Sequence, residues 1–381
     1  MKAETLTGRD PATGEPLSVT VRDGLIAEVG PGPAGATDWL APGLVDLQVN
    51  GYAGHDFNDP SSTVATVVAI TRALRAQGVT TCVPTLVTAA HDRIGGALRT
   101  IAAARAADPL VRHAIPYVHL EGPHLSPEDG PRGVHDPAQI RPPSIGEFTD
   151  WQAAGAGLIG MVTLSPHFDG AAGYTRELTR HGVHVAIGHT HATPAQISAV
   201  ADAGARLSTH LGNGAHAMLP RHPNYLWAQL ADDRLTAGFI ADGHHLPADT
   251  LTAMIRAKGP DRSVLVSDAV ALAGMPAGHY RTPVGGDVEL SPAGRLVKSG
   301  TPYLAGAARG LADGVAHAAV AARLGLAGAL RLATAGPGRF TGGRGVLTAG
   351  APADLIQFAW APGDPTLRMT RVLVRGQDVR P

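Results

Sequence analysis

Apolar and polar positions along the middle of the chain alternate between short, β-branched runs and longer stretches with helical spacing. Each short run ends near Gly, Pro or a polar cluster, as buried strands do. Eight runs predict strands, at Leu44–Asn50, Val79–Val87, Ala114–Glu121, Leu158–Leu164, Val183–His189, Arg206–His210, Leu235–Ala241 and Val264–Asp268. The intervening stretches predict helices, at Ser61–Gln77, His91–Ala106, Thr175–His181, Thr193–Ala203 and Pro247–Ala257.

This alternation indicates an α/β fold, a parallel (β/α)8 TIM-like barrel. A doubly wound open sheet is the alternative. The even repeats, without a Gly-rich phosphate loop after the first strand, favour closure. Residues 1–43 and 345–381 differ, because they carry short polar/apolar alternation with Gly- and Pro-rich turns. We predict that these two parts pair into one small β-sandwich domain, with a hydrolase barrel of residues 44–344 between them.

Composition narrows the class of protein. The formal net charge is −1, so no basic surface favours a nucleic acid or an anionic membrane. A single cysteine excludes internal disulfides and a Cys-rich zinc site. The first residues carry no secretory pattern, and the apolar stretch 316–335 is interrupted by Arg323 and Arg331, which predicts two packed helices rather than a membrane span. We therefore expect a cytoplasmic protein.

Four polar residues end four predicted strands: Glu121, His189, His210 and Asp268. The C-terminal strand ends of such a barrel converge on one mouth. One carboxylate and two imidazoles can hold a divalent metal with a position left open for water. Asp268 could then carry a proton from that water to a leaving nitrogen. Each residue alone also fits a structural role, such as a helix cap for Asp268, but four such roles at four strand ends are a poorer explanation.

Other histidines compete for these roles. His191 lies two residues after His189, but His189 ends the apolar run and is preferred as the ligand. His119 shares a strand face with Glu121 and is expected deeper in the barrel.

Several segments resemble, in order, those of the amidohydrolase superfamily and, within it, the N-acetylglucosamine-6-phosphate deacetylases. They are APGLVDLQVNGYAGHDFND, HLEGPHLSPEDGPRGVH, AIGHTHATPAQI, STHLGN, IADGHHLP, LVSDAVALAG and GAPADLIQF. The resemblance covers nearly the whole chain. It implies that Glu121, His189 and His210 bind the metal and that Asp268 is the general base and then the general acid.

The resemblance also implies roles for residues around the mouth. His135 would hydrogen-bond the carbonyl oxygen of the amide and stabilise the developing oxyanion. Substrate contacts would come from His245, Asn213, Gly214, Gln48 and Asn50. It further implies a homodimer.

The first strand bears on the number of metals. The superfamily often opens with His-x-His, where this chain has Gln48 and Asn50. Amides bind transition metals poorly beside imidazole. The binuclear branch also uses a carboxylated lysine at a strand end, and none of the three lysines lies at one. We therefore expect one divalent metal ion, Zn2+, at a ligand set that would also accept Fe2+, Mn2+ or Co2+.

The loop after STHLGN bears on the substrate. Related enzymes continue into Arg-Glu-Pro-Gly, whose arginine grips the sugar phosphate. Here Arg221 aligns with that arginine, but His222 replaces the acid and the Gly is absent. The leading hypothesis is hydrolysis of N-acetylglucosamine 6-phosphate to glucosamine 6-phosphate and acetate. The alternatives are an unphosphorylated N-acyl amino sugar or another small N-acyl compound, a non-catalytic ligand-binding homologue, and a cyclic amidase or nucleobase deaminase.

Overall fold

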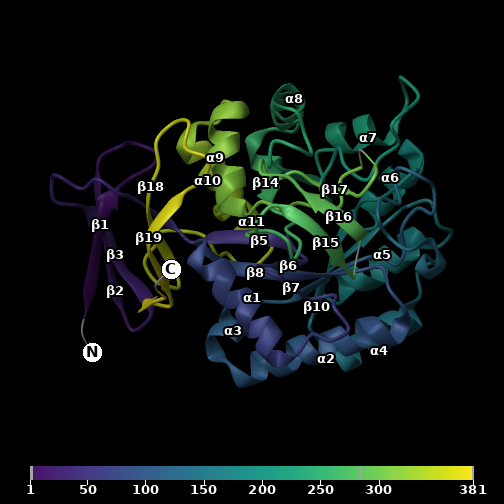
Figure 1. Ribbon diagram of the computed structural model, residues 1–381, viewed down its shortest axis with the longest axis horizontal. Coiled ribbons are helices and arrows are strands. Elements are labelled where there is room, and N and C mark those ends of the chain that lie inside the picture. Colours follow the sequence, from purple (N-terminus) through teal and green to yellow (C-terminus); the bar gives the residue numbers. More distant parts are fainter. Residues whose placement is uncertain (1–2, 284, 302, 380–381) are drawn as a thin grey trace.

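Eight parallel strands form the centre of the protein and curve into a nearly closed barrel (Figure 1). The computed structural model describes residues 3–283, 285–301 and 303–379. The strands, paired in chain order, are β5 (Leu44–Val49), β8 (Val79–Val87), β9 (Val118–Glu121), β10 (Ile159–Leu164), β11 (His184–Ile187), β12 (Leu207–Ser208), β13 (Thr236–Ile240) and β14 (Ser263–Val266). The last strand returns to the first, where the Asp268 N–H donates to the Gln48 carbonyl over 3.0 Å. This contact closes the seam and confirms the predicted barrel over the open sheet.

Helices surround the barrel, as α1 to α4 do along one side in Figure 1. Thr63 caps the first helix and Thr193, followed by Pro194, caps the sixth, as their sequence signals predict. The helices are α1 (Val64–Ala76), α2 (His91–Ala107), α3 (Pro109–Ala114), α4 (Ile145–Ala154), α5 (Ala171–Arg180), α6 (Pro194–Asp202), α7 (Tyr225–Ala231), α8 (Ala248–Lys258), α9 (Leu311–Ala321), α10 (Gly325–Ala333) and α11 (Ala335–Gly338), with short 3-10 turns at η1 (Pro137–Gln139) and η2 (Pro260–Arg262).

Two of these helices change the sequence interpretation. The predicted strand from Ala114 begins only at Val118, because the Asp108 carboxylate caps α3 and holds residues 109–114 in a helix. The apolar stretch 316–335 forms parts of α9, α10 and α11, and the two longer helices confirm the predicted pair. Within the described ranges, no helix has both the length and the apolar content needed to cross a bilayer.

The two ends of the chain meet in one seven-stranded sheet, seen at the left of Figure 1 in purple and yellow. Its apolar side chains, among them Leu6, Val19, Leu40 and Leu373, form a core of their own. The sheet curls until Ile26 N–H reaches a carbonyl just before β18, at 2.9 Å. The fold class is thus confirmed, while the domain limits at 43 and 345 stay a prediction. The strands, in spatial order, are β20 (Gln377–Asp378), β19 (Arg368–Val374), β18 (Leu355–Ala359), β4 (Trp39–Pro42), β1 (Glu4–Arg9), β2 (Pro16–Arg22) and β3 (Leu25–Pro31).

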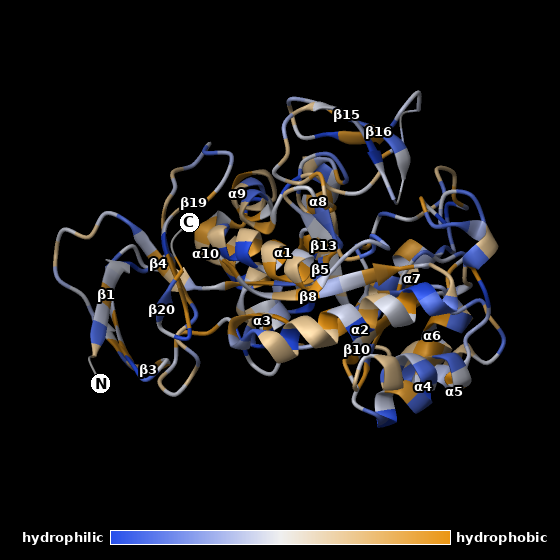
Figure 2. Ribbon diagram, turned by 60° about the horizontal axis from the view of Figure 1, so that its bottom comes forward, coloured by the Kyte–Doolittle hydropathy of each residue, from blue (hydrophilic) through white to orange (hydrophobic). Residues whose placement is uncertain are grey.

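A three-stranded antiparallel sheet that the sequence did not predict lies between β14 and α9. It comprises β15 (Gly278–Thr282), β16 (Gly286–Leu290) and β17 (Leu296–Lys298), and Figure 2 shows β15 and β16 at the outside of the molecule. The Ala293 carbonyl lies 2.9 Å from Nε2 of His244, which links this sheet to the loop after β13. A two-stranded ribbon, β6 (Gly51–Tyr52) and β7 (His55–Asp56), follows β5.

Candidate active site

Three predicted ligands converge at the mouth of the barrel. Nε2 of His189 and Nε2 of His210 each lie 3.0 Å from the same carboxylate oxygen of Glu121, and 3.1 Å from each other. All three side chains are buried. Within the part of the chain that the structure describes, this is the one group of three His, Cys, Asp or Glu residues whose ligand atoms could hold a metal ion.

The backbone turns sharply at three of the four residues that are predicted to carry the chemistry. His189, His210 and Asp268 follow the ends of β11, β12 and β14, with φ of 48°, 27° and 50°. Non-glycine residues adopt this left-handed region rarely, at a cost of about 1–3 kcal/mol, and such strain concentrates at functional sites. The turns take each side chain out of the strand alternation at the barrel rim.

The donor set fits a divalent cation. Nδ1 of His189 lies 2.7 Å from the Pro131 carbonyl, which can only accept, so Nδ1 carries a proton. Its Nε2 faces Glu121 and His210 and would be the nitrogen that offers a lone pair to a bound cation. Second contacts of this kind orient histidine ligands in metal sites.

The charges of Glu121 and His210 stabilise each other. Burial opposes ionisation of Glu121, but hydrogen bonds from both histidines outweigh it and hold its pKa well below the usual range. Burial likewise opposes protonation of His210, yet the Glu121 carboxylate raises the His210 pKa to about 9. Without a bound cation His210 therefore holds a proton, and metal binding would displace that proton.

Asp268 lies beside this group as a half-buried carboxylate. Nδ2 of Asn50 donates to its Oδ1 over 2.8 Å. Burial, and then the charge of Glu121, raise the Asp268 pKa to about 6, a suitable value for a proton carrier near neutrality. Gln48 makes the matching contact on the other carboxylate, where its Nε2 donates to Oε2 of Glu121 over 3.0 Å. The contacts of Gln48 and Asn50 therefore orient the two acids, and their predicted contact with substrate stays a prediction.

His135 reaches the site from the loop after β9. Its ring lies 4.5 Å from that of His189, edge to face, and it is buried. Burial, and then the nearby His189, lower the His135 pKa to about 3, so the imidazole is neutral at pH 7. Its Nδ1 lies 3.0 Å from Oγ1 of Thr88, a partner that no sequence motif indicates.

The predicted substrate residues are placed differently from one another. His245 is oriented by Asp242, whose Oδ2 lies 2.7 Å from Nδ1 of the ring. Asn213 donates to the His210 carbonyl over 3.3 Å. Gly214 has a φ of +55° and presses on the His189 ring, where a Cβ would lie 2.7 Å from Nδ1.

Arg221 lies on the exposed loop before α7. Its carbonyl accepts hydrogen bonds from Asn224 and Trp227. The exposed position leaves the phosphate grip a prediction. The competing histidines lie elsewhere: Nδ1 of His191 contacts Ser126, and His119 is deeper, with Nε2 2.7 Å from Oγ1 of Thr163.

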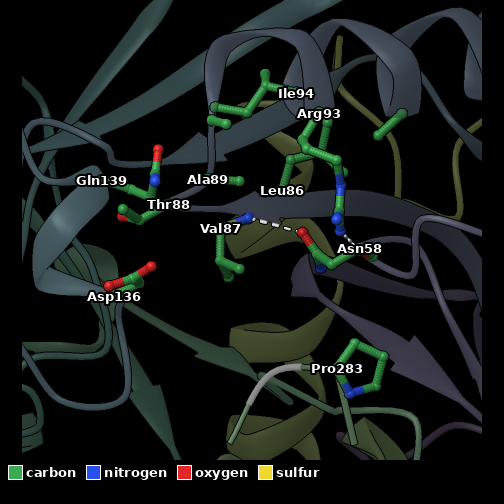
Figure 3. A pocket seen from close by; sticks show the side chains of 12 residues that line it. Asn58, Leu86, Val87, Thr88, Ala89, Arg93, Ile94, Asp136, Gln139 and Pro283 are labelled. Carbon is green, nitrogen blue, oxygen red and sulfur yellow. Dashed lines mark hydrogen bonds between the residues drawn. The ribbon is translucent and has the colours of Figure 1, made fainter.

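A hollow of about 270 Å³ lies at the rim beside Thr88 (Figure 3). Asp136 and Gln139 flank it on one side, and Arg93 and Asn58 on the other. Glu121, His189 and His210 do not line this hollow, but Thr88, which does, also contacts His135.

Comparison with known proteins places this arrangement in a family. The model of the amidohydrolase family matches residues 39–379. The chain belongs to the amidohydrolase family. It is therefore an amide-cleaving hydrolase of a metal-dependent family, and Glu121, His189 and His210 form a group that could hold such a metal.

Relatives within the family have narrower names. The chain is 32% identical to an N-acetylgalactosamine-6-phosphate deacetylase of Escherichia coli O157:H7, over 94% of this chain and 93% of the relative. It is 31% identical to an N-acetylglucosamine-6-phosphate deacetylase of Bacillus subtilis (strain 168), over 74% and 70% of the two chains. A solved structure from Mycobacterium smegmatis, an aspartate-to-alanine variant of N-acetyl-D-glucosamine-6-phosphate deacetylase in complex with N-acetyl-D-glucosamine-6-phosphate, is 31% identical, covers 100% of both chains and has a TM-score of 0.87.

Proposed function

We propose that this protein hydrolyses N-acetylglucosamine 6-phosphate to glucosamine 6-phosphate and acetate. One observation carries the chemistry: Glu121, His189 and His210 converge within hydrogen-bonding distance of one another, beside the half-buried carboxylate of Asp268. The names of the relatives supply the substrate class, a phosphorylated N-acetyl hexosamine.

Each side chain has a defined task in this proposal. A single divalent cation, which we take to be Zn2+, would be held by Glu121, His189 and His210 and would polarise the amide carbonyl and lower the pKa of a water. Asp268 accepts the proton of the attacking water and passes it to the departing amine, so one carboxyl acts as base and then as acid. Asn50 holds Oδ1 of Asp268 during both transfers.

His135 stabilises the negative charge that develops on the carbonyl oxygen. It can do so as a neutral donor if Thr88 donates its hydroxyl to Nδ1, which leaves the proton on Nε2. A donor of this kind is worth about 3 kcal/mol of transition-state stabilisation. His245, Asn213 and Gly214 would meet the sugar, and Arg221 its phosphate. We place the enzyme in the cytoplasm, as a homodimer.

A second candidate is the epimer at carbon 4, N-acetylgalactosamine 6-phosphate. The relative from E. coli O157:H7, which matches over most of both chains, has that name. The amide chemistry is the same for both sugars, so only contacts with the carbon-4 hydroxyl distinguish them.

A four-substrate assay tests the proposal. Purified zinc-loaded protein would be given the 6-phosphates of N-acetylglucosamine and N-acetylgalactosamine and both unphosphorylated sugars, with the free amine measured over time. We expect the highest kcat/KM with N-acetylglucosamine 6-phosphate and a loss of about 10²- to 10⁴-fold in Asp268→Asn. Equal rates without phosphate would overturn the substrate assignment, and a metal-loaded wild type that releases no amine would support a ligand-binding homologue.

A further inference from the structure

Glu128 lies where three loops meet, and these loops follow the three strands that end in the converging ligands. Glu128 itself belongs to the loop after β9. His191 comes from the loop after β11, and His216 from the loop after β12. The carboxylate of Glu128 reaches both histidines, with Oε2 2.8 Å from Nε2 of His216 and Oε1 3.8 Å from Nε2 of His191.

His216 is held at three of its atoms. Its Nδ1 lies 3.0 Å from the hydroxyl of Tyr225, and its backbone N–H donates to that same hydroxyl over 2.8 Å. Nε2 faces Glu128. Tyr225 is the first residue of α7 and is buried, so it offers a rigid support. His216 therefore links the loop after β9 to the start of a helix.

His191 is connected to the backbone of a converging ligand. Its Nδ1 lies 2.6 Å from Oγ of Ser126, and the Ser126 N–H donates to the His189 carbonyl over 2.8 Å. The Glu128 N–H in turn donates to Oγ of Ser126 over 3.2 Å. These contacts join the start of the loop after β9 to His189, the predicted metal ligand that follows β11.

The same loops press on the ring of His189. The Pro131 carbonyl accepts from Nδ1 of that ring, and Gly214 lies against its face. Gly130 packs against the backbone beside His216, where a Cβ would lie 2.9 Å from its Cα. The orientation of His189 thus depends on how the loops after β9 and β12 sit against each other, and Glu128 joins those two loops.

We propose that Glu128 is a positioning residue: through His216 and His191 it fixes the three loops that orient His189 and present Asn213 and Gly214 to the substrate. The Glu128 side chain is 49% exposed, so water screens each ion pair and each contributes little to global stability. The effect of Glu128 lies in the geometry of the mouth, where outer contacts of a metal ligand affect affinity and activity by about 10- to 100-fold.

The experiment compares Glu128→Ala with Asp129→Ala. Asp129 is the adjacent carboxylate, its side chain is 92% exposed, and it pairs with Arg132 in its own loop. Each zinc-loaded variant would be mixed with excess chromogenic chelator and the rate of metal release followed. KM and kcat on N-acetylglucosamine 6-phosphate would be measured separately. We expect release about tenfold faster and KM about tenfold higher in Glu128→Ala, with the melting temperature within about 2 °C of wild type and Asp129→Ala unchanged in each measurement.

A second set of variants separates positioning from simple destabilisation. His216→Ala should speed metal release as Glu128→Ala does, and the double variant should add little more, because both remove the same link. Unchanged release in Glu128→Ala, or fully additive effects in the double variant, would overturn the proposal. Only the kinetic measurement rests on the proposed function. An inactive wild type with faster release in Glu128→Ala would reject the deacetylase assignment and support the positioning role.

Discussion

Gly214 gives the most direct test of how closely the mouth is built around His189. Alanine at this position must adopt a φ of +55°, which costs about 1–2 kcal/mol for an L residue. Its Cβ would also lie 2.7 Å from Nδ1 of His189, roughly 0.7 Å closer than an ordinary contact. The ring cannot retreat without stretching its 2.7 Å hydrogen bond to the Pro131 carbonyl.

The expected consequence of Gly214→Ala is a displaced ligand. A misplacement of about 1 Å can lower catalysis by about 10²-fold, so we expect kcat/KM to fall by about 10- to 100-fold, or about 1.4–2.7 kcal/mol. Zinc affinity, measured by competition with a chelator of known affinity, should fall as well, because Nε2 of His189 moves with the ring.

Gly157→Ala is the matched control. Gly157 also has a left-handed φ, +77°, but a Cβ there would meet no described atom within 4 Å. Both variants carry the backbone cost, which thermal unfolding of the metal-free proteins would report. If Gly214→Ala bound zinc and turned over substrate as Gly157→Ala does, the close packing on His189 would have no functional weight.

Three further predictions concern Asp268, Asn50 and Lys258. The acid limb of kcat/KM should lie at or below about pH 6, because Asp268 must be ionised to accept a proton and a bound cation lowers its pKa further. Below that pKa, kcat/KM should fall tenfold per pH unit, and a limb above pH 7 would contradict the assignment. Asn50→Ala removes a hydrogen bond to the ionised form and should move that limb to higher pH, whereas a shift to lower pH would refute the contact. Lys258→Met should lower the free energy of unfolding in urea by about 3 kcal/mol, since the buried Nζ donates to the carbonyls of Gln229 and Asp232 at the end of α7; a loss under 1 kcal/mol would count against it.

The strands were predictable because apolar runs mark buried strands. The run Val79–Val87 coincides with β8 from end to end. The predicted runs Val183–His189 and Val264–Asp268 extend two residues beyond β11 and β14. The extra residues are where the chain turns left-handed, a conformation that His and Asp seldom adopt and that periodicity does not encode. The sequence thus selected residues that the fold brings together, but it did not predict the turns that orient them.

The parts that sequence could not predict depend on contacts between distant segments. Strands β15 and β16 alternate between exposed positions and half-buried or buried ones, so they lack the apolar run by which the barrel strands were found. Thr88 and Glu128 carry no motif of their own, because their importance comes from His135 and His216, which only the folded loops bring near them. The contact between Asp242 and His245 could have been predicted from the sequence, since an Asp three residues before His245 is a common local turn partner.

The sheet built from both chain ends cannot be completed on the ribosome until β18 has been synthesised. β4 pairs with β18, which is synthesised roughly 300 residues later. At about 5–20 residues per second, β1 to β4 wait on the order of 15–60 s with one edge of β4 unpaired. An unpaired edge can join another chain, so nascent chains are exposed to misassembly during that time. Only a chain translated as far as β18 can close that edge, so a chain released before β18 would leave β4 open to pairing with another chain.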